Sequence, residues 1–199
     1  MRLVNNSVLV IAVSVWGSIG FLAYHSASKA SAQTLSDRNA RSAEVFVRMA
    51  PVLQSPRCMN CHTSTNFPRQ GDDRHRHIMS VMRGPEDHGV PALQCQACHH
   101  DANSSETGVP GVPDWHLAPL EMAWEGLTVG ELCRLILDPN KGGIGPDQFI
   151  PHLQTDLVQW AWSPGIDLDG LPRTTPPIPR DEFIALAKEW VATGASCPN

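Results

Sequence analysis

The first strong helical pattern of apolar residues lies between Ser36 and about Leu53. Ser36 can cap the N-terminus of this helix, and two prolines are expected to end it just before the first pair of cysteines. Its apolar stripe consists of Val45, Phe46 and Met49, which fall on one face of a helix. The pattern therefore predicts a helix that buries one side in the core.

A second helix is expected to begin at Thr128. Thr128 and Glu131 have the spacing of a capping box, in which each residue satisfies a backbone N–H of the other. Pro139 and the glycine pair that follows it are expected to end the helix. Leu132, Leu135 and Ile136 form its apolar face.

A third helix is expected from about Asp181 to Thr193, closed by Gly194. No strand pattern stands out, and residues 57–114 are loop-rich with few apolar positions. The 17 prolines and 15 glycines favour many turns and short helices. The sequence thus predicts a mainly α, loop-rich single domain. The buried stripe of the last helix consists of Phe183, Leu186, Ala187 and Trp190.

The beginning of the chain has the pattern of a secretory signal. Arg2 precedes a mostly apolar run from Val8 to Ala23, and small residues at 30–32 offer a cleavage site. Because this run is long for a cleaved signal and short for a membrane span, a retained anchor is the alternative. Residues 1–32 are predicted to export the protein to the periplasm, where disulfides persist, and residues 33–199 to form the domain.

The charge of the chain excludes two classes of protein. Charged residues make up only 18% of the sequence, with 15 basic against 20 acidic residues and a net charge of −5. Nucleic-acid binding through bulk positive charge is therefore excluded, as is a coiled coil, which needs far more Glu, Lys and Leu. The mildly acidic balance favours a partner with a basic docking patch.

Two CxxCH motifs, CMNCH at residues 58–62 and CQACH at residues 95–99, carry the clearest chemical signal. CxxCH is the attachment signature for c-type haem. Two cysteines three apart reach the vinyl groups on one porphyrin edge, and the histidine that follows becomes the proximal iron ligand. The motifs predict two covalent haem c groups. Their thioether residues are Cys58, Cys61, Cys95 and Cys98, and their proximal ligands are His62 and His99.

A zinc site of four cysteines is the main alternative to two haems. The 33 residues between Cys61 and Cys95 make a longer gap than a zinc ribbon uses, and zinc gives no reason for a histidine after each pair. The motifs are also only 37 residues apart, whereas tandem single-haem domains would separate them by about 80–100 residues. Both haems are therefore expected to share one cytochrome c-like domain, with short helices packed around them.

Each iron needs a sixth ligand or an open site for catalysis, and histidine and methionine are the usual ligands. His77 is favoured because it lies in the loop between the two motifs. His152 is favoured for the other iron because it stands alone among apolar residues. The rivals are His75, Met79, His116 and Met122, followed by Met82, His88 and His100.

Cys133 and Cys197 remain after the motifs take four of the six cysteines. A disulfide between them is the simplest account in an oxidising compartment. It would close a loop of more than 60 residues, which is worth about 4 kcal/mol in the chain-entropy model. A cysteine thiolate ligand to one haem is the alternative.

The mature chain also contains a series of longer stretches: CMNCH, QGDDRHRHIMSVMRGPEDHGVPALQCQACH, HDAN, LAPLEMAWEGL, ELCRLILDPNKGG and GASCP. Together they resemble a family of small exported dihaem c-type cytochromes often labelled as a subunit of isoquinoline 1-oxidoreductase, a molybdenum hydroxylase. The resemblance covers nearly all of the mature chain. It implies His77 and His152 as the distal ligands. It also implies a subunit that passes electrons from a periplasmic dehydrogenase, molybdenum- or quinone-dependent, toward the respiratory chain.

Two classes of function remain open at this point. An electron carrier needs both irons six-coordinate, whereas a small dihaem enzyme, such as a peroxidase or a sulfur-compound oxidoreductase, needs one open iron. Candidate ligands outnumber the two sites, and no acid/base cluster clearly belongs to a substrate pocket. The carrier, with no catalytic residues and a redox protein as its partner, is therefore favoured. It would contact a membrane only if the N-terminal segment is retained.

Overall fold

The computed structural model describes the backbone of residues 17–199 and the side chains of residues 33–199. Residues 38–199 form one compact unit, and the residues before them belong to a separate unit. The predicted signal, residues 1–32, lies outside the part of the chain whose side chains are described. Within the described part, no helix combines the length and the hydropathy that a membrane crossing requires.

The described chain is mainly helical, as the sequence predicts. The α-helices are α1 (Gly17–Leu53), α2 (Pro56–Met59), α3 (Val129–Leu137), α4 (Gly145–Leu153), α5 (Asp156–Gln159) and α6 (Arg180–Ala192). The short 3₁₀ turns are η1 (Ile78–Ser80), η2 (Pro85–Asp87), η3 (Cys95–Ala97), η4 (Leu120–Met122), η5 (Pro139–Lys141) and η6 (Trp160–Trp162). The strands β1 (Arg69–Gln70) and β2 (His75–Arg76) form one antiparallel pair, and β3 (Gly89–Val90) and β4 (Leu93–Gln94) form another.

The first helix ends at Leu53 as expected but begins earlier than predicted. α1 runs through Ser36 rather than beginning there, so the predicted cap is wrong. The physical reason is that residues 24–35 contain neither proline nor glycine and continue the helix without a break. Pro51 lies inside the last turn and removes a hydrogen bond there, and the helix ends two residues later at Leu53.

The two C-terminal helix predictions are confirmed. Thr128 Oγ1 accepts a hydrogen bond from the Glu131 N–H at 3.3 Å, and the Glu131 carboxylate accepts one from the Thr128 N–H at 2.8 Å. This capping box starts α3. α6 ends at Ala192, and Gly194 follows with a φ of 108° that favours glycine. α4 is a helix that the sequence analysis did not single out, and it carries His152.

Trp190 of α6 lies at the centre of the apolar core and is fully buried. Its ring lies 5.1 Å from the ring of Phe46 on α1 and 5.2 Å from that of Phe149 on α4, between centroids. The predicted disulfide is confirmed, because Cys133 on α3 is bonded to Cys197. These contacts join α1, α3, α4, α6 and the end of the chain into one framework.

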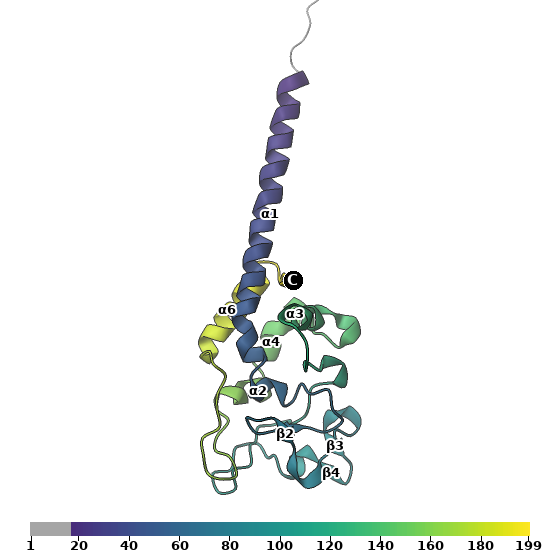
Figure 1. Cartoon of the computed structure of the whole chain (residues 1–199), viewed down its shortest axis with the longest axis vertical. Helices are drawn as coiled ribbons and strands as arrows, with labels where there is room; N and C mark the ends of the chain where they lie inside the picture. Colours follow the sequence, from purple (N-terminus) through teal and green to yellow (C-terminus); the bar gives the residue numbers. More distant parts are fainter. Residues whose placement is uncertain (1–16) are drawn as a thin grey trace, which may run out of the picture. The chain divides into compact units, whose positions relative to one another are not determined.

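The remainder of the compact unit is organised differently. Within residues 38–199, α3, α4 and α6 lie toward one end of the unit, and the labelled strands lie toward the other (Figure 1). The segment 57–114, which carries both CxxCH motifs, contributes only Met59 to the buried members of the apolar cluster. This confirms that an ordinary apolar core is thin in that segment.

Candidate functional site

The first motif begins on the short helix α2. Pro56 occupies its first turn, where a missing N–H costs nothing. The N–H groups of Cys61 and His62 both donate to the Cys58 carbonyl, at 3.2 and 3.1 Å. This turn brings the two thiols and the imidazole to one wall of a cavity of about 200 Å³.

The His62 ring is held from two sides. Its Nδ1 lies 2.8 Å from the Met122 carbonyl, so Nδ1 carries the proton and Nε2 keeps its lone pair. The Trp124 ring stacks on it, with centroids 3.4 Å apart and planes 13° apart. Burial lowers the pKa of His62 to about 3, so the ring is neutral at pH 7 and able to bind a metal ion through Nε2.

The second motif repeats these contacts with other residues. The N–H groups of Cys98 and His99 donate to the Cys95 carbonyl, at 3.2 and 2.9 Å. The Nδ1 of His99 lies 2.7 Å from the Pro110 carbonyl, and the Trp115 ring stacks on it, with centroids 4.4 Å apart and planes 1° apart. Burial lowers the pKa of His99 to about 4. Both motif histidines therefore share one tautomer and one kind of support.

Each motif histidine shares its cavity with a second histidine from a distant segment. His152 of α4 lines the cavity of about 200 Å³ together with His62, and the charge of one would lower the pKa of the other. His77 and His99 line two adjoining cavities of about 160 and 70 Å³, with ring centroids 5.9 Å apart. We call Cys58, Cys61, His62 and His152 the first site. The second site consists of Cys95, Cys98, His99 and His77.

His152 is exposed by surface area, yet burial lowers its pKa. The His152 ring lines a cavity, so part of its surface is open although protein atoms surround it and shield it from bulk solvent. The lowered pKa keeps this ring neutral, as an iron ligand must be.

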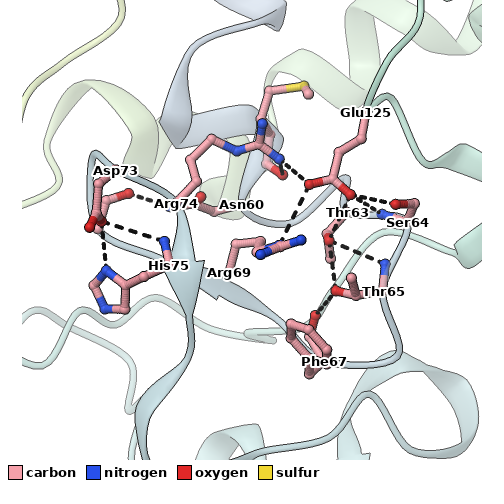
Figure 2. Close-up of polar contacts among 12 residues, drawn as sticks. Asn60, Thr63, Ser64, Thr65, Phe67, Arg69, Asp73, Arg74, His75 and Glu125 are labelled. Carbon is pink, nitrogen blue, oxygen red and sulfur yellow. Dashed lines mark hydrogen bonds and ion pairs between the residues drawn. The ribbon is translucent and has the colours of Figure 1, made fainter.

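The rival ligands lie in other environments. His75 is exposed and pairs with Asp73, with 2.6 Å between Nδ1 and the carboxylate (Figure 2). Met79 borders the second site but is 74% exposed. Met122 lines the first cavity, where its carbonyl already holds His62. Of the other rivals, His116 borders both sites, and His88 pairs with Asp114. The Met82 sulfur accepts a hydrogen bond from Arg76, and His100 is exposed.

The four motif cysteines are not gathered into one group of potential metal ligands. Among residues 33–199, the one cluster of potential ligands close enough to hold a metal ion is His88, Asp114 and His116. Burial raises the pKa of the Cys58 and Cys61 thiols to about 11 and about 12, so both thiols are protonated at pH 7. Neutral thiols beside a neutral imidazole in an apolar cavity fit the covalent attachment of a porphyrin.

A polar network that the sequence analysis did not identify fixes the chain after the first motif. Glu125, which follows Trp124, accepts hydrogen bonds from the Ser64 N–H at 2.7 Å and from the Thr63 hydroxyl at 3.2 Å (Figure 2). Arg74 also pairs with this carboxylate. Burial alone would raise the pKa of Glu125, but the Ser64 hydrogen bonds and Arg74 outweigh it and lower the pKa. No spacing signal marks these residues, because they meet only in the folded chain.

A comparison of the chain with protein-family models, curated protein sequences and solved structures finds no match among any of them.

Proposed function

We propose that this chain is a dihaem c-type cytochrome that transfers electrons in the periplasm. The observation that carries the proposal is the pairing of histidines. His62 shares a cavity with His152 and His99 with His77, each from a distant segment, while His116, which borders both sites, is held by the Asp114 carbonyl through its Nδ1. Cys58 and Cys61 would anchor one haem, and Cys95 and Cys98 the other.

The protein's own residues would position and insulate these groups. When bound, haem iron supplies reversible one-electron oxidation and reduction. The carbonyls of Met122 and Pro110 fix the tautomers of His62 and His99, so both Nε2 atoms are ready to bind iron. The rings of Trp124 and Trp115 hold the planes of these imidazoles. The apolar walls of the first cavity would exclude water, which raises the potential of a haem relative to an exposed one.

An electron carrier fits this arrangement better than an enzyme. With two histidines assigned to each site, neither iron keeps a position open for a substrate. We therefore assign the chain no catalytic residues. Together with the resemblance to exported dihaem cytochromes, this supports a redox subunit of a periplasmic molybdenum- or quinone-dependent dehydrogenase. Its electrons would pass toward the respiratory chain.

Spectroscopy of the full-length protein, produced with the haem-attachment machinery, tests the proposal. A haemochrome assay should give two haems per chain, and electron paramagnetic resonance should show two low-spin ferric centres. His152→Ala and His77→Ala should each convert one haem to high spin, because each removes one sixth ligand. His75→Ala is the matched control, since His75 pairs with Asp73 in solvent, and it should leave both haems low-spin.

Two results would contradict the proposal. A wild-type protein without haem would exclude the cytochrome altogether. A high-spin iron in the wild type, together with binding of a small ligand such as cyanide, would instead indicate a small dihaem enzyme with one open site.

A further inference from the structure

A buried arginine lies on the wall that the two sites share. Arg57, directly before Cys58, is 6% exposed. It lines both the cavity of the first site and the larger cavity of the second. Of the motif residues, Cys61 is the one that lines both of these cavities as well. A permanent positive charge therefore lies between the two positions where porphyrins are proposed to bind.

The charge of Arg57 is only partly compensated by the described residues. Asp72 pairs with its Nη2, but that carboxylate side chain is 45% exposed, whereas the arginine side chain is 3% exposed. The Arg57 Nε is buried and has no hydrogen-bond partner among the described residues. The face of Trp160 lies 5.9 Å from the guanidinium carbon. A buried cation with an unsatisfied N–H is costly unless an anion approaches it.

A second arginine adds positive charge on the same side of the second site. Arg173 lines the same cavity as Arg57 and donates hydrogen bonds to the carbonyls of Gly108, at 2.6 Å, and Pro164, at 3.0 Å. Burial, and then repulsion by Arg57, lowers the pKa of Arg173. Two guanidinium groups on the wall of one cavity favour an anionic occupant in that cavity.

We propose that Arg57 binds a propionate of the second haem and, from the wall that the two sites share, raises the reduction potentials of both haems. The proposal rests on the proposed function, because it needs a haem in each site. Haem carries two propionate carboxylates as its only anionic substituents, and arginine is the side chain best suited to bind carboxylates. One buried cation beside both groups would stabilise the reduced form of each, since reduction adds negative charge near it.

Potentiometric titration of the full-length protein tests this inference. In Arg57→Gln, both potentials should become more negative, each by at least a tenfold change in the reduction equilibrium, which is about 59 mV for one electron. Asp72→Asn should move both potentials in the opposite direction, because it removes the negative charge that Arg57 already faces. Arg57→Lys should lie between wild type and Arg57→Gln. Arg134→Gln is the matched control, because it removes an exposed arginine that lines neither site, and it should change nothing.

The outcomes separate the inference from the proposed function. The haem count of the wild type is read first, and a count of zero would contradict the proposed function itself. With two haems present, unchanged potentials in Arg57→Gln would overturn the inference, and so would a shift of only one. If Arg57→Gln fails to accumulate, Asp72→Asn decides, since Asp72 is half-exposed and tolerates substitution. A positive shift of both potentials would then support the inference, and no shift would overturn it.

Discussion

The two sites share one motif and one kind of support, yet they are built into different parts of the compact unit. The first site lies against the apolar core, with Leu53 of α1, Ile136 of α3 and Phe149 of α4 in its wall. The second site lies among loops, and its wall includes Ile78 and other exposed apolar side chains. The exposed side chains of Met79 and Leu168 line the same cavity, so one edge of the second site faces solvent.

This difference separates two roles that a bound porphyrin can have. In the first site it would fill the space between helices that hold the fold together. In the second site it would fill a space between loops that gain order from it and leave one edge accessible. We therefore expect the first site to determine folding and to have the higher potential, because burial raises the potential of a haem. The second site, with its accessible edge, is the one suited to exchange electrons with a partner protein.

Removal of each haem in turn is the strongest test of this difference. Cys58→Ala with Cys61→Ala should reduce the free energy of unfolding by about 5 kcal/mol, because it leaves about 200 Å³ empty in the core, at roughly 24 cal/mol per Å³. Cys95→Ala with Cys98→Ala should cost only about 1–2 kcal/mol, because exposed loops can close over the space. Urea unfolding followed by circular dichroism measures both.

Each of these double variants serves as the control for the other, since both remove two thioethers from the same kind of motif. Equal losses of stability, or a larger loss from the second site, would show that the core does not depend on the first site. The haem count of each variant, which should be one, verifies that only one site has been lost.

The disulfide should support the first site and leave the second unaffected. Cys133→Ala with Cys197→Ala opens a bridge with a sequence separation of 64, which is worth about 4 kcal/mol in the chain-entropy model. Cys133 lies on α3, the helix that places Ile136 in the wall of the first cavity. Thermal unfolding should therefore begin at lower temperature, with the first haem losing its low-spin spectrum before the second.

The single variant Cys197→Ala separates the bridge from the packing of Cys133, which is fully buried. If the bridge is responsible, this variant should lose nearly as much stability as the double variant. Simultaneous loss of both low-spin spectra would contradict the assignment of the disulfide to the first site.

The sequence predicted the parts of this fold that depend on neighbours along the chain. The capping box of Thr128 and Glu131 starts α3 as expected, since both partners lie within one turn. The CxxCH turns could be predicted for the same reason, because their hydrogen bonds join residues close together in the sequence. Ser36 was wrong as a cap, because side-chain chemistry permits a cap there but does not stop the helix before it.

The contacts between distant segments could not be predicted from the sequence. Trp124 and Trp115 stack on the motif histidines, and no sequence pattern marks these contacts. Glu125 reaches Ser64 across 61 residues of chain, and no local pattern marks such a pair. The sequence favoured His77 and His152 only as candidates. Their placement beside separate motifs depends on packing that spacing alone does not determine.

The smallest expected effect is the contribution of His88, beside the second motif, to the dependence of stability on pH. The His88 carbonyl accepts a hydrogen bond from the Cys95 N–H at 2.9 Å, so this residue supports the second motif directly. Its ring Nε2 lies 3.1 Å from the Asp114 carboxylate. Burial would lower the pKa of His88, but the Glu86 carbonyl and the Asp114 carboxylate outweigh it and raise the pKa.

A raised pKa in the folded state stabilises the protein below about pH 6.5, the value in the unfolded chain, and this contribution is lost as the pH rises through the folded value. The buried His62 and His99, whose pKa values are lowered, destabilise the protein as the pH falls from 8 to 6, and the His88 contribution offsets part of this loss. The His88 contribution should be well under 1 kcal/mol, because its side chain is 40% exposed and solvent screens the pair. Glu125, beside the first motif, has a lowered pKa and stays ionised throughout this range. In urea unfolding, the loss of stability between pH 8 and pH 6 should therefore be larger in His88→Gln than in the wild type, and an equal loss in both proteins would show that His88 does not contribute.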